Sequence, residues 1–137
     1  MAVEGQVLGR AVKQVQYRQY RTLDSRLARI GTTLAQWDAL RAISRSPGAS
    51  ARSLAARTFQ SEQAFGTLAG RLVAQGLIDR RPGRGRSIEH HLTPAGEKIL
   101  EAGHRIADDA LAEIFSPLSD DERATLLDLL LRVGRAG

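Results

Sequence analysis

One short segment interrupts an otherwise helical pattern in this 137-residue chain. Within residues 77–92, Ile88, His90 and Leu92 alternate with polar neighbours, which is the two-residue period of a half-buried strand. Before this strand comes a loop rich in glycine, proline and arginine, Arg80-Arg81-Pro82-Gly83-Arg84-Gly85-Arg86. The segment therefore predicts a single β-hairpin, and the fold class is mainly α with one small hairpin.

Two short helices are expected directly before the hairpin. Ser50 is placed to cap the first, and Ser61 to cap the second, whose apolar residues keep a helical period up to Gly76. A further helix precedes them, where Thr33 and Gln36 predict a capping box. Helix, tight turn, helix and basic hairpin follow one another in the order of a winged helix-turn-helix.

Long helices are expected on both sides of this unit. Residues 5–30 keep one apolar face and end at Gly31, and a helix of that length would reach about 39 Å, more than the core of so small a domain. Thr93-Pro94 begins a fifth helix, and a capping box at Ser119 begins a sixth, whose leucines cover nearly all its sides. Because a helix that is apolar all round must be buried, both ends favour packing against a second copy of the chain.

We therefore expect one domain over residues 1–137. Residues 32–94 would form the winged helix-turn-helix, and residues 1–31 and 95–137 would form a helical dimerisation region. The formal net charge is +5, from 20 basic and 15 acidic residues, and residues 34–94 alone hold nine basic and four acidic side chains. This distribution favours one surface that faces a polyanion, although solvated helices rich in arginine would produce the same pattern.

The composition excludes several classes of protein. The chain has no cysteine, which excludes disulfides, thiolate metal sites and thiol-based redox sensing. The longest apolar run near its end, Leu129-Leu130-Leu131, is far too short to cross a bilayer, and residues 1–30 carry too many charges for a signal peptide. We expect a cytoplasmic protein without a membrane partner.

A winged helix-turn-helix suits double-stranded DNA on physical grounds. A helix with its side chains is about 10–12 Å wide, which fits a major groove about 12 Å wide. The amides at its N-terminus can donate to phosphate, and a hairpin tipped with arginines can reach the adjacent minor groove, where the negative potential is concentrated.

The chain resembles the multiple-antibiotic-resistance regulator (MarR) family of bacterial transcription factors. The resemblance covers nearly the whole chain and rests on the order of its parts, which are Thr33-Leu34-Ala35-Gln36-Trp37-Asp38-Ala39-Leu40, Leu54-Ala55-Ala56-Arg57, Ser61-Glu62-Gln63, Gly76-Leu77-Ile78, Leu92-Thr93-Pro94-Ala95-Gly96 and Ser119-Asp120-Asp121-Glu122. It implies a homodimer in which two winged modules read a pseudo-palindromic operator about one DNA turn apart. It also implies a repressor that a small aromatic or anionic ligand releases from DNA.

The resemblance assigns roles to residues of the fourth helix and the hairpin. Ser61 would cap the recognition helix and bond to phosphate, while Gln63, Ala64 and Thr67 would face base edges. Arg71, one turn further along, would reach phosphate. The minor-groove contact would come from Arg84 and Arg86, with Arg52 and Arg57 as weaker phosphate candidates.

The resemblance also implies a ligand site between the dimerisation helices and the winged module. Tyr20 and Trp37 are the candidate wall residues, and Arg41 is the candidate partner for an anion, although each also suits a purely structural role.

Two departures from the family concern the recognition surface. Gly66 and Thr67 stand where family members often carry longer polar residues. Gly66 and Gly70 each cost about 1 kcal/mol of helix propensity relative to alanine. We interpret these two glycines as positions where packing tolerates glycine, rather than as positions where DNA or another backbone approaches closely. The wing is also shorter than usual and lacks an acidic residue before its arginines, so we expect much of the affinity to come from phosphate and minor-groove contacts.

Other functions find less support in the sequence. The chain has neither a glycine-rich phosphate loop after a strand nor a nucleophile paired with a base, so we predict no catalytic residues, no cofactor and no metal. Glu101, His104 and Asp108 share a helix face that could hold zinc, but a solvated polar face explains them better. Six aromatic residues, mostly at apolar helical positions, do not suggest an RNA-stacking surface. The alternative is a winged helix that binds only protein, with its basic wing turned away from the recognition helix.

Overall fold

The computed structural model describes residues 2–135 and contains seven helical segments and one hairpin over that range. Their order is α1 (Gly5–Leu27), the 3-10 turn η1 (Ala28–Ile30), α2 (Leu34–Arg45), α3 (Ala51–Arg57), α4 (Glu62–Ala74), β1 (Ile78–Pro82), β2 (Ile88–Leu92), α5 (Pro94–Ile114) and α6 (Asp120–Gly134). The expected fold class, mainly helical with one small hairpin, is confirmed. The first helix is shorter than expected, because its last turn tightens to 3-10 before Gly31 takes a left-handed conformation at φ 81°.

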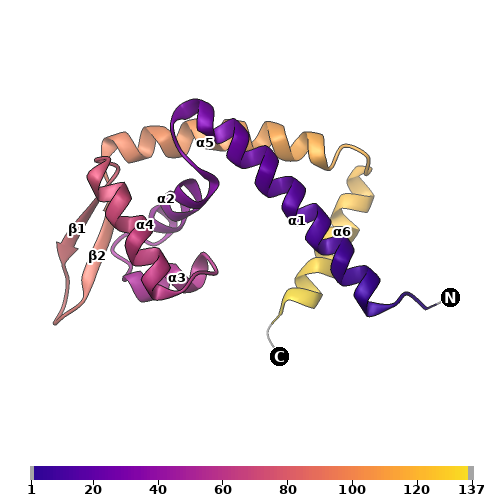
Figure 1. The fold of residues 1–137 in the computed structure, drawn as a ribbon, viewed down its shortest axis with the longest axis horizontal. Coiled ribbons are helices and arrows are strands. Elements are labelled where there is room, and N and C mark those ends of the chain that lie inside the picture. Colours follow the sequence, from indigo (N-terminus) through magenta and orange to yellow (C-terminus); the bar gives the residue numbers. More distant parts are fainter. Residues whose placement is uncertain (1, 136–137) are drawn as a thin grey trace.

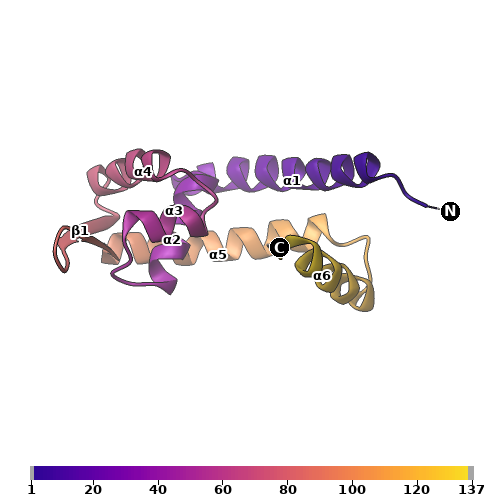
Figure 2. The same ribbon diagram turned by 90° about the horizontal axis from the view of Figure 1, so that it is seen from below.

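The elements divide between two ends of an elongated molecule. The hairpin, α3 and α4 lie towards one end, whereas the starts of α1 and α6 lie at the other (Figure 1). Helix α5 runs the length between them, and Figure 2 shows α1 and α5 extending in the same direction away from α4. The winged unit and the long helices are therefore joined mainly through α5 and the end of α1.

Side-chain caps begin five of the helices. The hydroxyls of Thr33, Ser50, Ser61, Thr93 and Ser119 each accept a hydrogen bond from an amide three residues on. At Ser119 the capping box is complete, because the Glu122 carboxylate also accepts from the Ser119 amide. The box expected at Thr33 is only half formed, since the Gln36 side chain accepts from the Thr32 hydroxyl instead, at 3.2 Å.

The core lies inside the winged unit and beneath α5. Its fully buried side chains come from α1, α2, α3, α4 and β1, and include Leu27, Leu40, Ile43, Leu54, Phe65, Leu72 and Ile78. Burial in the second strand departs from the expected alternation, because Ile88 is exposed whereas His90 is buried. The hairpin is antiparallel and pairs Ile78 with Leu92 and Arg80 with His90.

Trp37 and Gly103 form the contact between α2 and α5. The indole Nε1 of Trp37 donates to the Leu100 carbonyl at 3.2 Å, and the ring lies directly on Gly103. A Cβ atom at position 103 would lie 2.1 Å from Nε1, so this crossing requires glycine.

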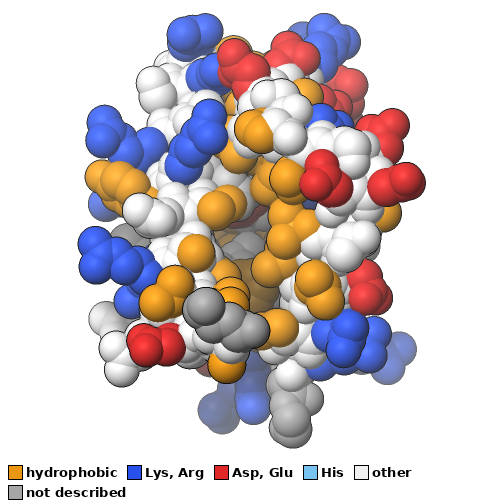
Figure 3. Space-filling view, turned by 90° about the vertical axis from the view of Figure 1, so that its right-hand side faces the viewer, with side chains coloured by type: hydrophobic (Ala, Val, Ile, Leu, Met, Phe, Trp, Pro, Cys, Tyr) orange, Lys and Arg blue, Asp and Glu red, His pale blue; other side chains and the backbone are white. Residues whose placement is uncertain are grey.

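The faces of α1 and α6 that point away from the winged unit are apolar and uncovered in the single chain. Every residue of α6 is at least partly exposed, including Leu127, Leu129, Leu130 and Leu131. Val7 and Val12 of α1 are also more than half exposed. Figure 3 shows apolar side chains gathered along the middle of this end of the molecule, with basic side chains on one flank and mostly acidic ones on the other. Among residues 2–135, no helix combines the length and hydrophobicity that crossing a bilayer requires.

We predict that Gly103→Ala lowers the free energy of unfolding by about 1–3 kcal/mol, because the added methyl group overlaps the buried indole and forces α2 and α5 apart. Gly70→Ala is the matched control, since a Cβ there meets no atom within 4 Å and should add up to about 1 kcal/mol of stability. Urea unfolding of both variants tests this. A Gly103→Ala protein as stable as the parent would contradict the described crossing.

Candidate nucleic-acid interface

Helix α4 presents two faces with different chemistry. Phe65, Ala69 and Leu72 are buried against the rest of the winged unit, at the spacing of one helix face. The opposite face exposes Gln63, Ala64, Thr67 and Arg71. The Ser61 hydroxyl accepts from the Ala64 amide at 3.0 Å and so begins the helix where expected.

The exposed residues of α4 line a single open groove of about 450 Å³. Ser61, Gln63, Ala64, Thr67 and Arg71 all contribute to its walls, together with Gln60, Leu68 and Ala35 at the start of α2. The structure therefore brings together all the residues of this helix that the sequence analysis selected. Apart from Arg71 they are neutral, so the groove offers hydrogen-bonding groups and methyl groups along a helix start.

The wing arginines lie on the turn between β1 and β2. The Gly83 amide donates to the Ser87 carbonyl at 2.8 Å, and Gly85 has a φ of 61°, which closes a tight turn. Arg84 and Arg86 are exposed there, and within residues 2–135 neither is paired with an acidic side chain. Two unpaired guanidinium groups at the tip of a hairpin suit contact with phosphate or with the minor groove.

The side chain of Arg80 links the wing to α4. Its Nη2 donates to the Gly66 carbonyl at 3.1 Å, although the two residues belong to different elements. A Cβ atom at Gly66 or at Gly70 would meet nothing within 4 Å, so packing inside this chain does not require either glycine. Sequence reasoning missed the role of Arg80, because a strand arginine that bonds to a helix carbonyl leaves no pattern in the sequence.

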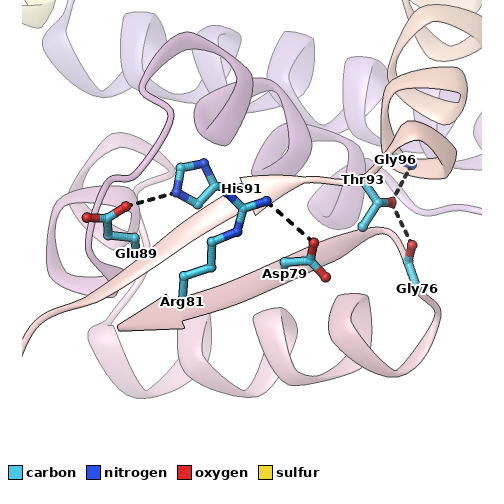
Figure 4. Close-up of polar contacts among 7 residues, drawn as sticks. All are labelled: Gly76, Asp79, Arg81, Glu89, His91, Thr93 and Gly96. Atoms are coloured by element: carbon cyan, nitrogen blue, oxygen red, sulfur yellow. Dashed lines mark hydrogen bonds and ion pairs between the residues drawn. The ribbon is translucent and has the colours of Figure 1, made fainter. Parts of the chain in front are cut away.

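The two strands of the wing carry further polar contacts (Figure 4). Arg81 pairs with Asp79 at 3.7 Å along β1, and His91 contacts Glu89 at 2.9 Å along β2. At the base of the hairpin, where it joins α4 and α5, the Thr93 hydroxyl donates to the Gly76 carbonyl at 2.6 Å and accepts from the Gly96 amide at 3.1 Å. That hydroxyl therefore fixes the start of α5 against the end of α4.

The winged unit and the whole chain both match known proteins. A family model described as the MarR family matches residues 30–87. A crystal structure of a mutant Escherichia coli MarR complexed with operator DNA matches with a TM-score of 0.87 and 28% identity, over 93% of this chain and 94% of that one. A probable transcriptional regulator from Pseudomonas aeruginosa matches with a TM-score of 0.83 and 29% identity, over 91% and 95% of the two chains.

The chain is therefore similar to MarR-family proteins, over residues 30–87 by the family model and over nearly its whole length by structure. A Mycobacterium tuberculosis MarR-family protein in complex with salicylic acid also matches, with a TM-score of 0.76 and 26% identity, over 93% of this chain and 96% of that one. No curated protein sequence matches the chain significantly. These matches span the long helices as well as the winged unit.

Trp37 and Arg41 on α2 are in contact, and Tyr20 lies on a different element, α1. The Arg41 guanidinium lies 4.8 Å from the centroid of the Trp37 ring, and the His104 ring meets that ring edge-on at 5.4 Å. Trp37 is buried, whereas Tyr20 is half exposed on α1. Within residues 2–135, no three histidine, cysteine or acidic side chains are grouped to hold a metal ion, and His104 packs on Trp37.

His90 joins the wing to the core. Only 2% of it is exposed, its Nδ1 lies 2.9 Å from the Ala49 carbonyl oxygen, and its ring meets the Phe65 ring edge-on. Burial lowers the pKa of His90, and the charges of Arg80 and His91 lower it further, while the hydrogen bond to Ala49 acts in the opposite direction. The neutral ring is therefore the form that the folded protein favours.

We predict that part of the acid sensitivity of folding comes from His90. As the pH falls below about 6.5, the unfolded chain binds a proton on this ring while the folded chain does not, so stability decreases until the pH reaches the lower folded-state pKa. His90→Leu should flatten this part of the profile, measured as urea midpoints at about pH 7.5 and about pH 5. The Ala49 carbonyl keeps its bond from the amide at position 90 in that variant. Equal pH slopes for variant and parent would exclude this role for His90.

Proposed function

We propose that this chain is a DNA-binding transcriptional regulator, a repressor that binds a pseudo-palindromic operator as a homodimer and that a small-molecule ligand releases. The observation that carries this proposal is that the arginine-tipped wing lies beside α4, since Arg80 donates to its Gly66 carbonyl, while exposed residues of the same helix line an open groove. Two similar proteins support it. The structure of the E. coli protein contains operator DNA, and the structure of the M. tuberculosis protein contains salicylic acid. A winged helix that binds only protein is not favoured, because such a protein would have its wing turned away from α4, whereas Arg80 of the wing is bonded to α4.

The roles of individual residues follow from their positions. Gln63 is suited to bidentate contact with adenine, and the methyl groups of Ala64 and Thr67 to contact with thymine. Ser61 and Arg71 are assigned to phosphate on either side of these base contacts. Arg84 and Arg86 are assigned to the neighbouring minor groove, because they are unpaired at the wing tip.

The remaining assignments concern the ligand and the cell. The ligand would approach the junction of the long helices and the winged unit, with Arg41 as the partner of its anionic group and Trp37 and Tyr20 nearby. Members of the MarR family are regulators and not enzymes, so we assign no catalytic step. A regulator that binds DNA would act in the cytoplasm.

We predict opposite signatures for wing and helix variants. Arg84→Ala and Arg86→Ala should each weaken binding to all duplexes alike and lower the slope of log affinity against log salt by about 1. Gln63→Ala should instead change the ranking of duplexes, at a cost of about 1–3 kcal/mol for the preferred base. Mobility shifts over a salt series with selected genomic fragments measure both effects.

Arg105→Ala on α5 is the matched control for charge, since this exposed arginine lies outside the groove and the wing. A parent protein whose binding to duplex DNA does not change with salt would favour the protein-only module. If the wing and Gln63 variants bound the selected duplex as the parent does, the assigned reading surface would be wrong.

We predict that the exposed leucines of α6 hold the homodimer together. Leu127 and Leu130 are 58% and 45% exposed in the single chain, so Leu127→Glu with Leu130→Glu should leave the protomer folded but disfavour its apolar contact with a partner. Light scattering should then give 14.9 kDa for the variant and twice that mass for the parent, and the variant should lose affinity for the full operator. Asp128→Asn, on the same helix, is the control. A parent of 14.9 kDa would contradict the dimer.

A further inference from the structure

The side chain of Arg80 lies on the face of the wing that meets α4. Arg80 is the cross-strand partner of His90, and directly opposed residues of an antiparallel pair point to the same face of the sheet. His90 packs edge-on against Phe65 of α4, and Arg80 donates to the carbonyl of the next residue, Gly66, at 3.1 Å. One cross-strand pair therefore attaches the hairpin to two consecutive residues of α4.

Beyond this pair, the hairpin stands free of the helices. Every residue from Arg84 to Ile88 is exposed, and Figure 1 shows the tip of the hairpin apart from the other elements. Within residues 2–135, Arg80 forms no ion pair, so no acidic group competes with the Gly66 carbonyl for its guanidinium group. The bond from Arg80 is therefore the last side-chain bond to α4, in the described part of the chain, before the tip that carries Arg84 and Arg86.

The absence of a side chain at position 70 leaves the Gly66 carbonyl open to Arg80. A helical side chain leans back over the residue four positions earlier. In this same helix, the Thr67 hydroxyl donates to the Gln63 carbonyl at 3.2 Å, so a side chain can reach the carbonyl one turn before it. Gly70 stands in that relation to Gly66. A Cβ atom alone at position 70 meets nothing within 4 Å, whereas a longer side chain there would extend over the carbonyl to which Arg80 bonds.

We propose that Arg80 is a positioning residue for DNA binding, which fixes the wing tip relative to α4, and that Gly70 keeps its bonding site uncovered. The proposal rests on the proposed function, since it concerns how the two reading elements of the regulator are held at one spacing. The wing arginines and the exposed face of α4 must reach neighbouring grooves of one duplex at the same time. A wing that is already held in place loses less conformational freedom on binding than a loose one, so the bond to Gly66 raises the affinity although Arg80 itself does not touch DNA.

A spin label at the wing tip tests the attachment without DNA. The chain has no cysteine, so Ser87→Cys, at an exposed position of the turn, gives a single labelled site. Arg80→Met keeps the length of the side chain but removes the donor, and we expect it to narrow the electron paramagnetic resonance spectrum of the label while the urea midpoint stays unchanged. Arg81→Met is the matched control, because this neighbouring arginine pairs with Asp79 of its own strand. A label as immobile in Arg80→Met as in the parent would overturn the proposal.

Substitutions at position 70 test the same bond from the side of α4. Gly70→Leu should narrow the spectrum as Arg80→Met does, because its side chain would lie over the Gly66 carbonyl, whereas Gly70→Ala should leave the spectrum unchanged. Gly70→Leu combined with Arg80→Met should add nothing further, since both changes remove one bond. A Gly70→Leu protein with the spectrum of the parent would contradict the role of Gly70.

A double-mutant cycle on DNA affinity separates positioning from direct contact. Mobility shifts with the selected duplex should show that Arg80→Met weakens binding about threefold to tenfold when Arg84 and Arg86 are present. In the protein that carries both Arg84→Ala and Arg86→Ala, the same change should cost less than about twofold, because no tip contact is left to position. An equal loss in both backgrounds would assign Arg80 to a DNA contact of its own and would exclude the positioning role.

The two kinds of measurement separate this proposal from the proposed function. A parent that binds no duplex DNA, although Arg80→Met frees the label, would contradict the regulator and with it the role in DNA binding, but would keep the attachment of the wing to α4. A parent that binds DNA while its label is as mobile as in Arg80→Met would contradict the attachment and keep the regulator.

Discussion

The crossing of α2 and α5 holds the two ends of this molecule in a fixed relation. The indole of Trp37 lies on the bare backbone of Gly103 and bonds to the Leu100 carbonyl, so α2 approaches α5 more closely than any side chain at position 103 would permit. Helix α5 then continues directly to the helices that expose their apolar faces. The direction of α4 relative to those faces therefore depends on one tryptophan and one glycine.

A second set of contacts reinforces this relation through α1. The Leu34 amide at the start of α2 donates to the Asp24 carboxylate of α1 at 2.9 Å, and the Arg26 guanidinium of α1 pairs with the Glu113 carboxylate of α5. The exposed pair adds little stability by itself, because solvent screens it. Its position matters more, since it marks where α1 and α5 lie side by side. Two such chains joined through α1 and α6 would present two α4 helices with little freedom between them.

Features set by local sequence were predictable, and features set by tertiary neighbours were not. Ser50, Ser61, Thr93 and Ser119 cap helices because a hydroxyl needs only the amide three residues on. The Thr33 hydroxyl also caps its helix, but the second bond of the capping box does not form, because the Gln36 side chain accepts from the adjacent Thr32 hydroxyl instead. The order of helices and hairpin could likewise be derived from periodicity alone.

The candidate site divides in the same way. The residues of α4 meet in one groove because a helical period decides which side chains share a face, and that period is visible in the sequence. The bond from Arg80 to Gly66 and the burial of His90 against Phe65 join segments that are distant in the chain, so no spacing predicts them. The resemblance groups Tyr20 with Trp37, whereas the charged and aromatic side chains that the structure places on the Trp37 ring are Arg41 and His104.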